Sequence, residues 1–116
     1  MLISEHIRLK EIECRCTDVK CTHTLIHPLV LFSFERLRKE CNDTPLMINS
    51  GFRCQLHNIA CGGVEKSKHC MGLAIDIQVP ANISGQEFKE LAEKAGFDYV
   101  KYYPGQGFCH CHINID

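Results

Sequence analysis

The segment at residues 67–76 contains the residue types and the spacing that a metal centre needs. His69 and Asp76 stand seven residues apart, just before an apolar run, and His110 and His112 supply further imidazole groups near the C-terminus. Together these segments can offer Zn²⁺ two nitrogen ligands and one oxygen ligand. The fourth tetrahedral position is then open to water, as a catalytic zinc site requires. The leading hypothesis from these residues is a small zinc hydrolase.

Two predicted strands bring these side chains onto exposed faces. Residues 74–79 alternate with a period of two, so Asp76 lies on the face opposite the branched apolar residues and points away from the core. The last segment, residues 99–116, is predicted to form two strands joined by a Pro-Gly-Gln-Gly turn. His110 and His112 share one face of the second strand, so both can point into one cleft.

Two helices must support these strands. Residues 29–41 are rich in apolar side chains, and Pro28 suits the first turn of a helix there. A second helix is predicted at residues 86–95, because Ser84 begins a segment with capping-box spacing and an apolar stripe follows. Between the helices, residues 45–50 are typical of a short buried strand, and the polar segment after them is expected to turn.

Composition limits the architecture and the partners. The 116 residues, 45% of them hydrophobic, suffice for one compact domain but not for two. The formal charge of −1 and the scattered Lys and Arg residues exclude a nucleic-acid partner. We expect a protein that is cytoplasmic as synthesised, because the sequence has neither the apolar run of a signal peptide nor a membrane span. The odd count of nine cysteines favours reduced thiols or metal thiolates over disulfides.

The pattern Ser-x-His-x-x-Gly-x-Ala-x-Asp at residues 67–76 carries a family resemblance. It resembles the zinc-binding motif of the D-alanyl-D-alanine carboxypeptidase and L-alanyl-D-glutamate endopeptidase family, which cleaves peptidoglycan in bacteria and in phage endolysins. The flanking elements that agree are Asn-Ser-Gly-Phe-Arg at 49–53, His-Asn at 57–58, Gly-Gly at 62–63, Tyr-Tyr-Pro at 102–104 and Phe-Cys-His-Cys-His at 108–112. The closing strand is also similar to that of the Hedgehog signalling domain.

This resemblance implies a fold and a ligand set. The fold is α+β, with a small antiparallel sheet that carries the zinc site and is backed by helices. Residues 28–116 would form the zinc peptidase-like domain, and the Cys-rich residues 1–27 would pack on it. Carried over position by position, the resemblance implies His69, Asp76 and His110 as the zinc ligands.

The resemblance also implies residues that bind the substrate. Arg53 would contact a substrate carboxylate or the carbonyl oxygen under attack, which suits a planar guanidinium that can donate two parallel hydrogen bonds. Ser67 would hold the loop around His69. Apart from the resemblance, Tyr102 and Tyr103 are expected to pack within their strand rather than to act in catalysis, and Tyr103 is kept as a candidate donor to a developing oxyanion.

The general base is where this sequence departs from the family. Many members have a carboxylate a few residues before the last zinc histidine, whereas residues 104–109 contain none. His112 could act as the base or stabilise an oxyanion. Alternatively, His112 binds the metal and His110 transfers the proton.

A second cluster of soft ligands lies near the N-terminus. Cys14, Cys16, Cys21 and His23 fall within ten residues and could close a structural zinc site, although the spacing is tighter than in paired Cys-x-x-Cys knuckles. Reduced thiols and disulfides are the alternatives. Cys54, Cys61 and Cys70 lie near the proposed cleft in the sequence, whereas Cys109 and Cys111 should face the core.

Three functions fit these features. The first is a zinc-dependent peptidase that hydrolyses an amide bond in peptidoglycan stem peptides or cross-links, as an endolysin released by a holin-like route or as a cell-wall-remodelling enzyme. The second is a non-catalytic zinc-binding module on the same scaffold. The third is a cysteine-rich redox or metal-binding protein.

Overall fold

A four-stranded antiparallel sheet forms the centre of the computed structural model, which describes residues 1–15, 24–63 and 67–115. The strands are β1 (Ile48–Ser50), β2 (Ala74–Gln78), β3 (Tyr99–Tyr103) and β4 (Phe108–His112), in the spatial order β1-β2-β4-β3. The predicted strand at 74–79 and the predicted C-terminal hairpin are thus both present.

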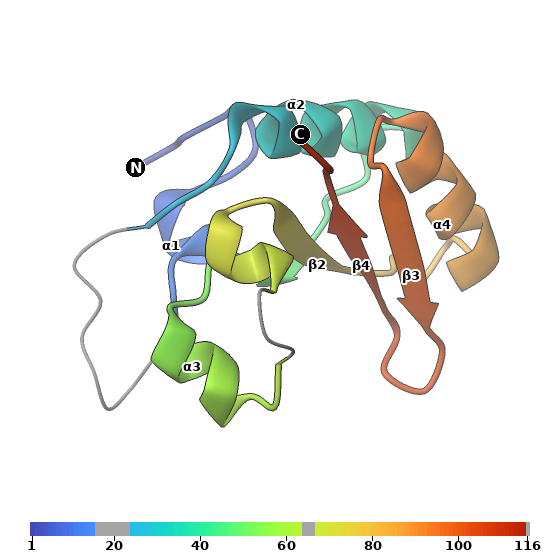
Figure 1. Ribbon diagram of the computed structural model, residues 1–116. Helices are drawn as coiled ribbons and strands as arrows, with labels where there is room; N and C mark the ends of the chain where they lie inside the picture. Colours follow the sequence, from blue (N-terminus) through green and yellow to red (C-terminus); the bar gives the residue numbers. More distant parts are fainter. Residues whose placement is uncertain (16–23, 64–66, 116) are drawn as a thin grey trace.

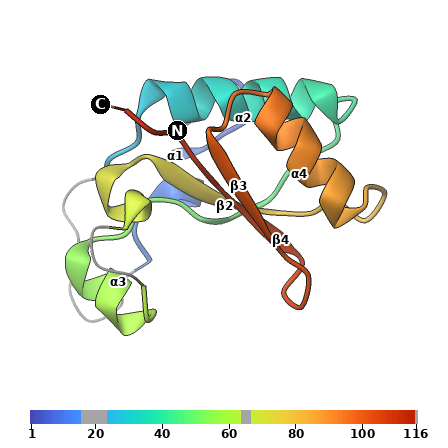
Figure 2. The same cartoon turned by 45° about the vertical axis from the view of Figure 1, so that its right-hand side comes forward.

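Two long helices cover one face of this sheet, and shorter helical segments lie around it (Figure 1). The two long ones are α2 (Pro28–Glu40) and α4 (Gly85–Lys94). The short ones are α1 (Leu9–Ile12), α3 (Gln55–Ala60) and the 3-10 helix η1 (Lys68–Met71). Helix α4 contacts α2, β3 and β4, and α3 lies away from both long helices in the two views (Figure 2). The α+β prediction is therefore confirmed.

The main core lies between the long helices and one face of the sheet. Phe34 of α2 and Phe88 of α4 are buried there with residues of β2 and β4, namely Ile75, Ile77, Cys109 and Cys111. Burying a large apolar side chain contributes about 1.5–3 kcal/mol. The strand alternation predicted from sequence therefore holds, because the apolar and thiol side chains occupy the core face.

The strand register defines the opposite face. Asp76 on β2 pairs with His110 on β4, and His110 pairs with Lys101 on β3. Side chains at directly paired positions project to the same face of a sheet. This register brings the three polar side chains together on the face that the long helices leave uncovered.

Capping interactions define where the long helices begin. The His27 ring accepts a hydrogen bond from the Leu29 N–H at the start of α2, and Pro28 occupies the first turn as predicted. The Ser84 hydroxyl accepts from the Glu87 N–H, 3.1 Å away, at the start of α4. Both helices differ from the predicted ranges by one residue at each end.

Other segments differ more from the sequence prediction. Strand β1 begins at Ile48, three residues later than predicted, and its pairing with β2 contains an irregularity between Ile48 and Ser50. Helices α3 and η1 occupy segments for which no helix was predicted. In the described part of the chain, no helix has the length and apolar character needed to cross a membrane.

The N-terminal residues pack against the same core. Ile7 and Ile12 are fully buried in it, and the Ile12 carbonyl accepts a hydrogen bond from the Phe52 N–H, with an N–O distance of 2.7 Å. Glu35 of α2 accepts hydrogen bonds from the Ser4 hydroxyl and from the His6 backbone N–H. These hydrogen bonds hold residues 4–6 against α2.

Candidate metal centre

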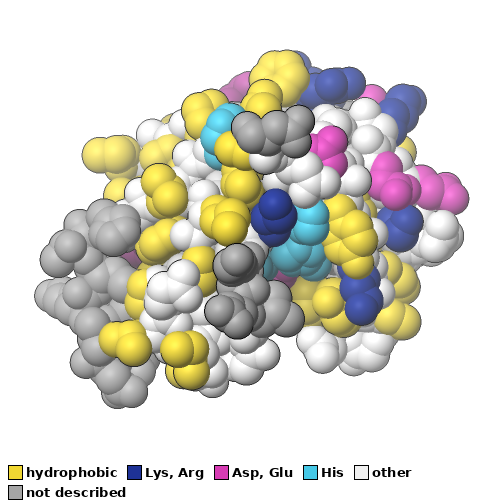
Figure 3. Space-filling view, in the orientation of Figure 1, with side chains coloured by type: hydrophobic (Ala, Val, Ile, Leu, Met, Phe, Trp, Pro, Cys, Tyr) yellow, Lys and Arg dark blue, Asp and Glu magenta, His cyan; other side chains and the backbone are white. Residues whose placement is uncertain are grey.

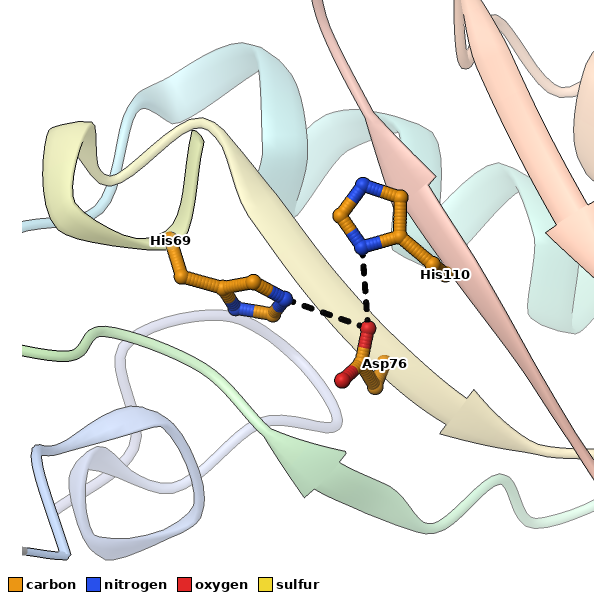
Figure 4. A group of neighbouring side chains, drawn as sticks. All are labelled: His69, Asp76 and His110. Atoms are coloured by element: carbon orange, nitrogen blue, oxygen red, sulfur yellow. Dashed lines mark hydrogen bonds and ion pairs between the residues drawn. The ribbon is translucent and has the colours of Figure 1, made fainter. Parts of the chain in front are cut away.

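Three side chains from different elements converge on the uncovered face of the sheet (Figure 4). They are His69 from η1, Asp76 from β2 and His110 from β4. One carboxylate oxygen, Oδ1 of Asp76, lies 3.1 Å from Nε2 of His69 and 3.1 Å from Nδ1 of His110. The three potential ligand atoms lie within 4.8 Å of one another, so this group could hold a metal ion.

His69 is held in one orientation by its surroundings. Its side chain is 1% exposed, and Nδ1 lies 2.7 Å from the carbonyl oxygen of Gly51. Because a carbonyl oxygen can only accept, Nδ1 carries the proton in this contact. Nε2 lies 3.1 Å from Oδ1 of Asp76, and a metal bound between them would take the place of the proton shared in this contact.

The loop that carries His69 depends on two motif residues. The Ser67 hydroxyl accepts a hydrogen bond from the His69 backbone N–H, 3.2 Å away. Gly72 ends η1 in the left-handed region, with φ of +69°, and a Cβ atom there would lie 2.7 Å from the Leu25 carbonyl oxygen. Glycine is the residue that fits both restrictions. These contacts explain why serine and glycine flank the histidine at this spacing.

Asp76 is ionised in this environment. Burial alone would raise the pKa of this carboxyl, but hydrogen bonds from His110 and His69, together with their charges, lower it to about 2. A carboxylate that stays charged near neutral pH is suited to binding a cation. The same property makes Asp76 a poor general base.

His112 lies behind His110. Its Nδ1 is 2.9 Å from Nε2 of His110, and its ring stacks on Tyr99 at a centroid distance of 4.8 Å. Burial, followed by the charges of His110 and Lys68, lowers the pKa of His112, which favours a neutral ring that can accept a hydrogen bond. The ring nitrogen beside Asp76 belongs to His110, which pairs directly with Asp76 across β2 and β4.

A cavity of about 560 Å³ opens onto the three side chains. Arg53 and Lys101 are among its lining residues, as are Ser67, Tyr99, Tyr103 and Gln106. The Arg53 Nε is buried without a hydrogen-bond partner among the described residues. Figure 3 shows histidine side chains in this hollow with Lys and Arg side chains around it. Within the described lining, Asp76 is the one carboxylate, so the cavity favours an anionic ligand.

Sequence reasoning did not identify Lys101. Strand periodicity places Lys101 and Tyr102 on opposite faces of their strand. The register that pairs Lys101 with His110, however, cannot be read from either strand's sequence alone. Its Nζ lies 5.0 Å from the ring centroid of Tyr103, the tyrosine singled out as an oxyanion donor. Both residues line the cavity.

A family model described as Peptidase M15 matches residues 5–112. The chain belongs to the Peptidase M15 family. This M15 membership makes the protein a metallopeptidase of a zinc-dependent family and confirms the resemblance seen in the sequence. No curated protein matches the chain.

The donor set of this M15 protein fits zinc. Two imidazole nitrogens and one carboxylate oxygen are common ligands of catalytic zinc, which keeps a further position open. The Gly51 carbonyl supplies the partner that a ligating histidine normally needs on its second nitrogen. The residues therefore suit the metal that the family uses.

Two pairs of cysteines in this M15 protein differ in their surroundings. Cys109 and Cys111 are fully buried in the core, where burial raises the pKa of Cys109 to about 11, so neither faces the metal centre. Cys14 and Cys54 have neighbouring sulfur atoms, 3.6 Å apart. The remaining members of the predicted N-terminal zinc cluster, Cys16, Cys21 and His23, lie outside the described residues.

Proposed function

We propose that this M15 protein is a zinc peptidase that hydrolyses an amide bond in peptidoglycan stem peptides or cross-links. The observation that carries the proposal is the convergence of His69, Asp76 and His110 in the lining of a cavity large enough for a short peptide. Membership of the family supplies the reaction class. The resemblance of residues 67–76 to the motif of peptidoglycan peptidases supplies the substrate class.

In this proposal the three convergent residues are the zinc ligands. A zinc ion bound there would supply a Lewis acid that polarises the scissile carbonyl and lowers the pKa of a water molecule. Asp76 would contribute the negative charge, and its low pKa keeps it available as a ligand over the working pH range. His69 would bind through Nε2, the nitrogen opposite its contact with Gly51.

The cationic side chains would orient the substrate. Arg53 has a buried Nε without a hydrogen-bond partner among the described residues, and Lys101 extends from the strand beside His110. Both can donate charge-assisted hydrogen bonds to a carboxylate of an acidic stem peptide. Tyr103 would donate to the oxygen on which charge develops.

His112 would position a ligand rather than transfer the proton. If Nδ1 of His110 binds the metal, the remaining proton of that ring lies on Nε2, and His112 accepts it across 2.9 Å. The direct contact with His110 and the stacking on Tyr99 support this role. The sequence hypothesis of His112 as general base is therefore the less favoured one.

An endolysin role is one version of the proposal. The protein would then be made in the cytoplasm and would reach the wall by a holin-like route. A cell-wall-remodelling enzyme with the same active site is the other version. The family resemblance of the sequence supports both equally.

A non-catalytic zinc module is the second candidate function. It is favoured by one observation, that Asp76 is the one carboxylate in the described cavity lining. The third hypothesis, a cysteine-rich redox protein, has less support, because Cys109 and Cys111 face the core and, among the described cysteines, only Cys61 lines the cavity.

Hydrolysis of purified peptidoglycan tests the proposal. The protein should release new amino groups from the wall material, chelation should stop the release, and added zinc should restore it. Mass spectra of the fragments then identify the bond that is cut. Zinc that is lost on Asp76→Ala, together with no cleavage of wall material by the unsubstituted chain, would instead favour the non-catalytic module.

A further inference from the structure

A pair of cysteines outside the cleft has the geometry of two ligands of one metal ion. Cys14 lies in the N-terminal segment, and Cys54 lies forty residues later, directly before α3. Their Sγ atoms are 3.6 Å apart, and both side chains are partly buried. We propose that Cys14 and Cys54 are ligands of a second, structural site for a soft divalent metal, with zinc as the natural occupant.

The sulfur separation matches thiolate coordination. Zinc–sulfur bonds are about 2.3 Å long, so two sulfurs on one tetrahedral zinc lie about 3.8 Å apart. The observed separation of 3.6 Å is close to this value and much longer than the sulfur–sulfur bond of a disulfide, about 2.0 Å. Without metal the Cys14 thiol donates a hydrogen bond to Sγ of Cys54 at this distance, so a bound metal would replace the shared proton with little movement of the two sulfurs.

Backbone donors point at both sulfur atoms. The Cys54 N–H donates to Sγ of Cys14 across 3.3 Å, and the His57 N–H donates to Sγ of Cys54 across 3.4 Å. Hydrogen bonds to the charged form of a group favour that form, and a metal binds the thiolate rather than the thiol. The arrangement thus lowers the cost of holding two thiolates side by side.

The site would connect two segments that meet next to the catalytic cleft. Beside the cysteines, the Phe52 N–H donates to the Ile12 carbonyl, and the Arg15 guanidinium donates to the Ile48 carbonyl. Arg53, which lines the cleft, is the residue before Cys54. A metal bound here would clamp the N-terminal segment to the loop that holds Arg53, and this role does not depend on the proposed peptidase activity.

The sequence around Cys14 is rich in further soft donors. Cys16, Cys21 and His23 follow within nine residues, outside the part of the chain that the structure describes. The proposal itself rests on Cys14 and Cys54. Cys61, an exposed thiol that directly follows α3 and lines the cleft cavity, provides the control.

Zinc content measured in a variant that lacks the cleft site distinguishes zinc bound by Cys14 and Cys54 from zinc bound in the cleft. The Asp76→Ala variant, purified without a histidine tag and under reducing conditions, should keep one zinc per chain. Adding Cys14→Ser or Cys54→Ser should remove that zinc, and adding Cys61→Ser should not. Cobalt in place of zinc should give thiolate-to-cobalt charge-transfer absorption that disappears with the same two substitutions.

Alkylation of the unsubstituted chain tests the site without any variant that could fail to fold. Zinc should protect Cys14 and Cys54 from iodoacetamide, and a chelator should remove the protection, whereas Cys61 should react in both states. The proposal is overturned if Asp76→Ala holds no zinc, or if chelation leaves the alkylation of Cys14 and Cys54 unchanged. Peptide mapping that finds these two residues joined in a disulfide would also overturn it.

Discussion

Nδ1 of His69 lies 2.7 Å from the carbonyl oxygen of Gly51, a residue eighteen positions earlier in the chain. This contact fixes the ring so that Nε2 faces Asp76. Gly51 itself lies against Ile12, since a Cβ atom at Gly51 would be 2.5 Å from the Ile12 Cα. The orientation of the candidate ligand therefore depends on how closely the N-terminal segment approaches this glycine.

Gly51→Ala should weaken both the fold and metal binding. The added methyl group meets backbone atoms of Ile12 that cannot move away easily, which costs about 1–3 kcal/mol of unfolding free energy. The displaced carbonyl should lower zinc affinity by roughly 10–100-fold. Thermal unfolding and zinc titration measure the two effects. Gly105→Ala is the control, because a Cβ there meets nothing within 4 Å, and equal effects of both substitutions would refute the account.

His112→Ala distinguishes a positioning residue from a base. If His112 orients His110, the variant should lose about 10–100-fold in zinc affinity but recover kcat at saturating zinc. His112→Asn, which keeps an acceptor, should restore much of the affinity. A base would behave differently, with kcat lower by about 100–10,000-fold at any zinc concentration. Steady-state kinetics over a zinc series decides between the two roles.

Arg53→Gln and Lys101→Gln should reduce activity on acidic substrates. Each loses a charge-assisted hydrogen bond worth about 1.5–3 kcal/mol, which corresponds to roughly 10–100-fold in kcat/KM. A stem peptide with amidated carboxyl groups should show a much smaller difference between variant and wild type. Lys89→Gln on α4 provides the control, since Lys89 pairs with Glu93 and does not line this cavity. An equal loss on the amidated peptide would contradict the substrate-binding role.

Acid should weaken the contacts that hold residues 4–6 against α2, because these contacts depend on the charge of Glu35. Burial alone raises the pKa of Glu35, but hydrogen bonds from Ser4 and His6 and the charge of His6 lower it below the ordinary value of 4.5. Because the folded pKa is the lower one, this contribution to stability is complete above pH 4.5 and is lost as the pH falls through the folded pKa.

Glu35→Gln isolates this contribution. The variant should lose about 1–3 kcal/mol of unfolding free energy at neutral pH and should depend less steeply on pH below 4.5. Denaturant unfolding of wild type and variant from pH 7 to pH 3 measures the difference, with the exposed Glu90→Gln as the control. Parallel pH profiles for Glu35→Gln and wild type would show that this carboxylate does not carry the effect.

Strand alternation and helix periodicity predicted most of the frame that supports the site. The period of two placed Asp76 and His110 on polar faces, and both lie on the face away from the core. The long helices were found because each buries a regular apolar stripe. These features depend on local patterns, which a sequence displays directly.

Features that depend on tertiary contacts could not be predicted. Helix α3 has only six residues, two of its apolar side chains, Leu56 and Ile59, are exposed, and a cysteine caps its first turn in place of the usual Ser, Thr, Asp or Asn. The position of His110, rather than His112, beside Asp76 follows from the pairing of β2 with β4, a long-range register. Lys101 belongs to the cavity through strand register alone.

The zinc content and the peptidoglycan hydrolysis of Asp76→Asn, measured beside Glu90→Gln, test the central claim most directly. Asp76 contacts both candidate histidine ligands, whereas Glu90 is exposed on α4. The account predicts that Asp76→Asn loses the cleft zinc and that its cleavage of wall material falls below detection, while Glu90→Gln matches the wild type. An Asp76→Asn protein that keeps full zinc content and cleaves peptidoglycan at the wild-type rate would contradict it.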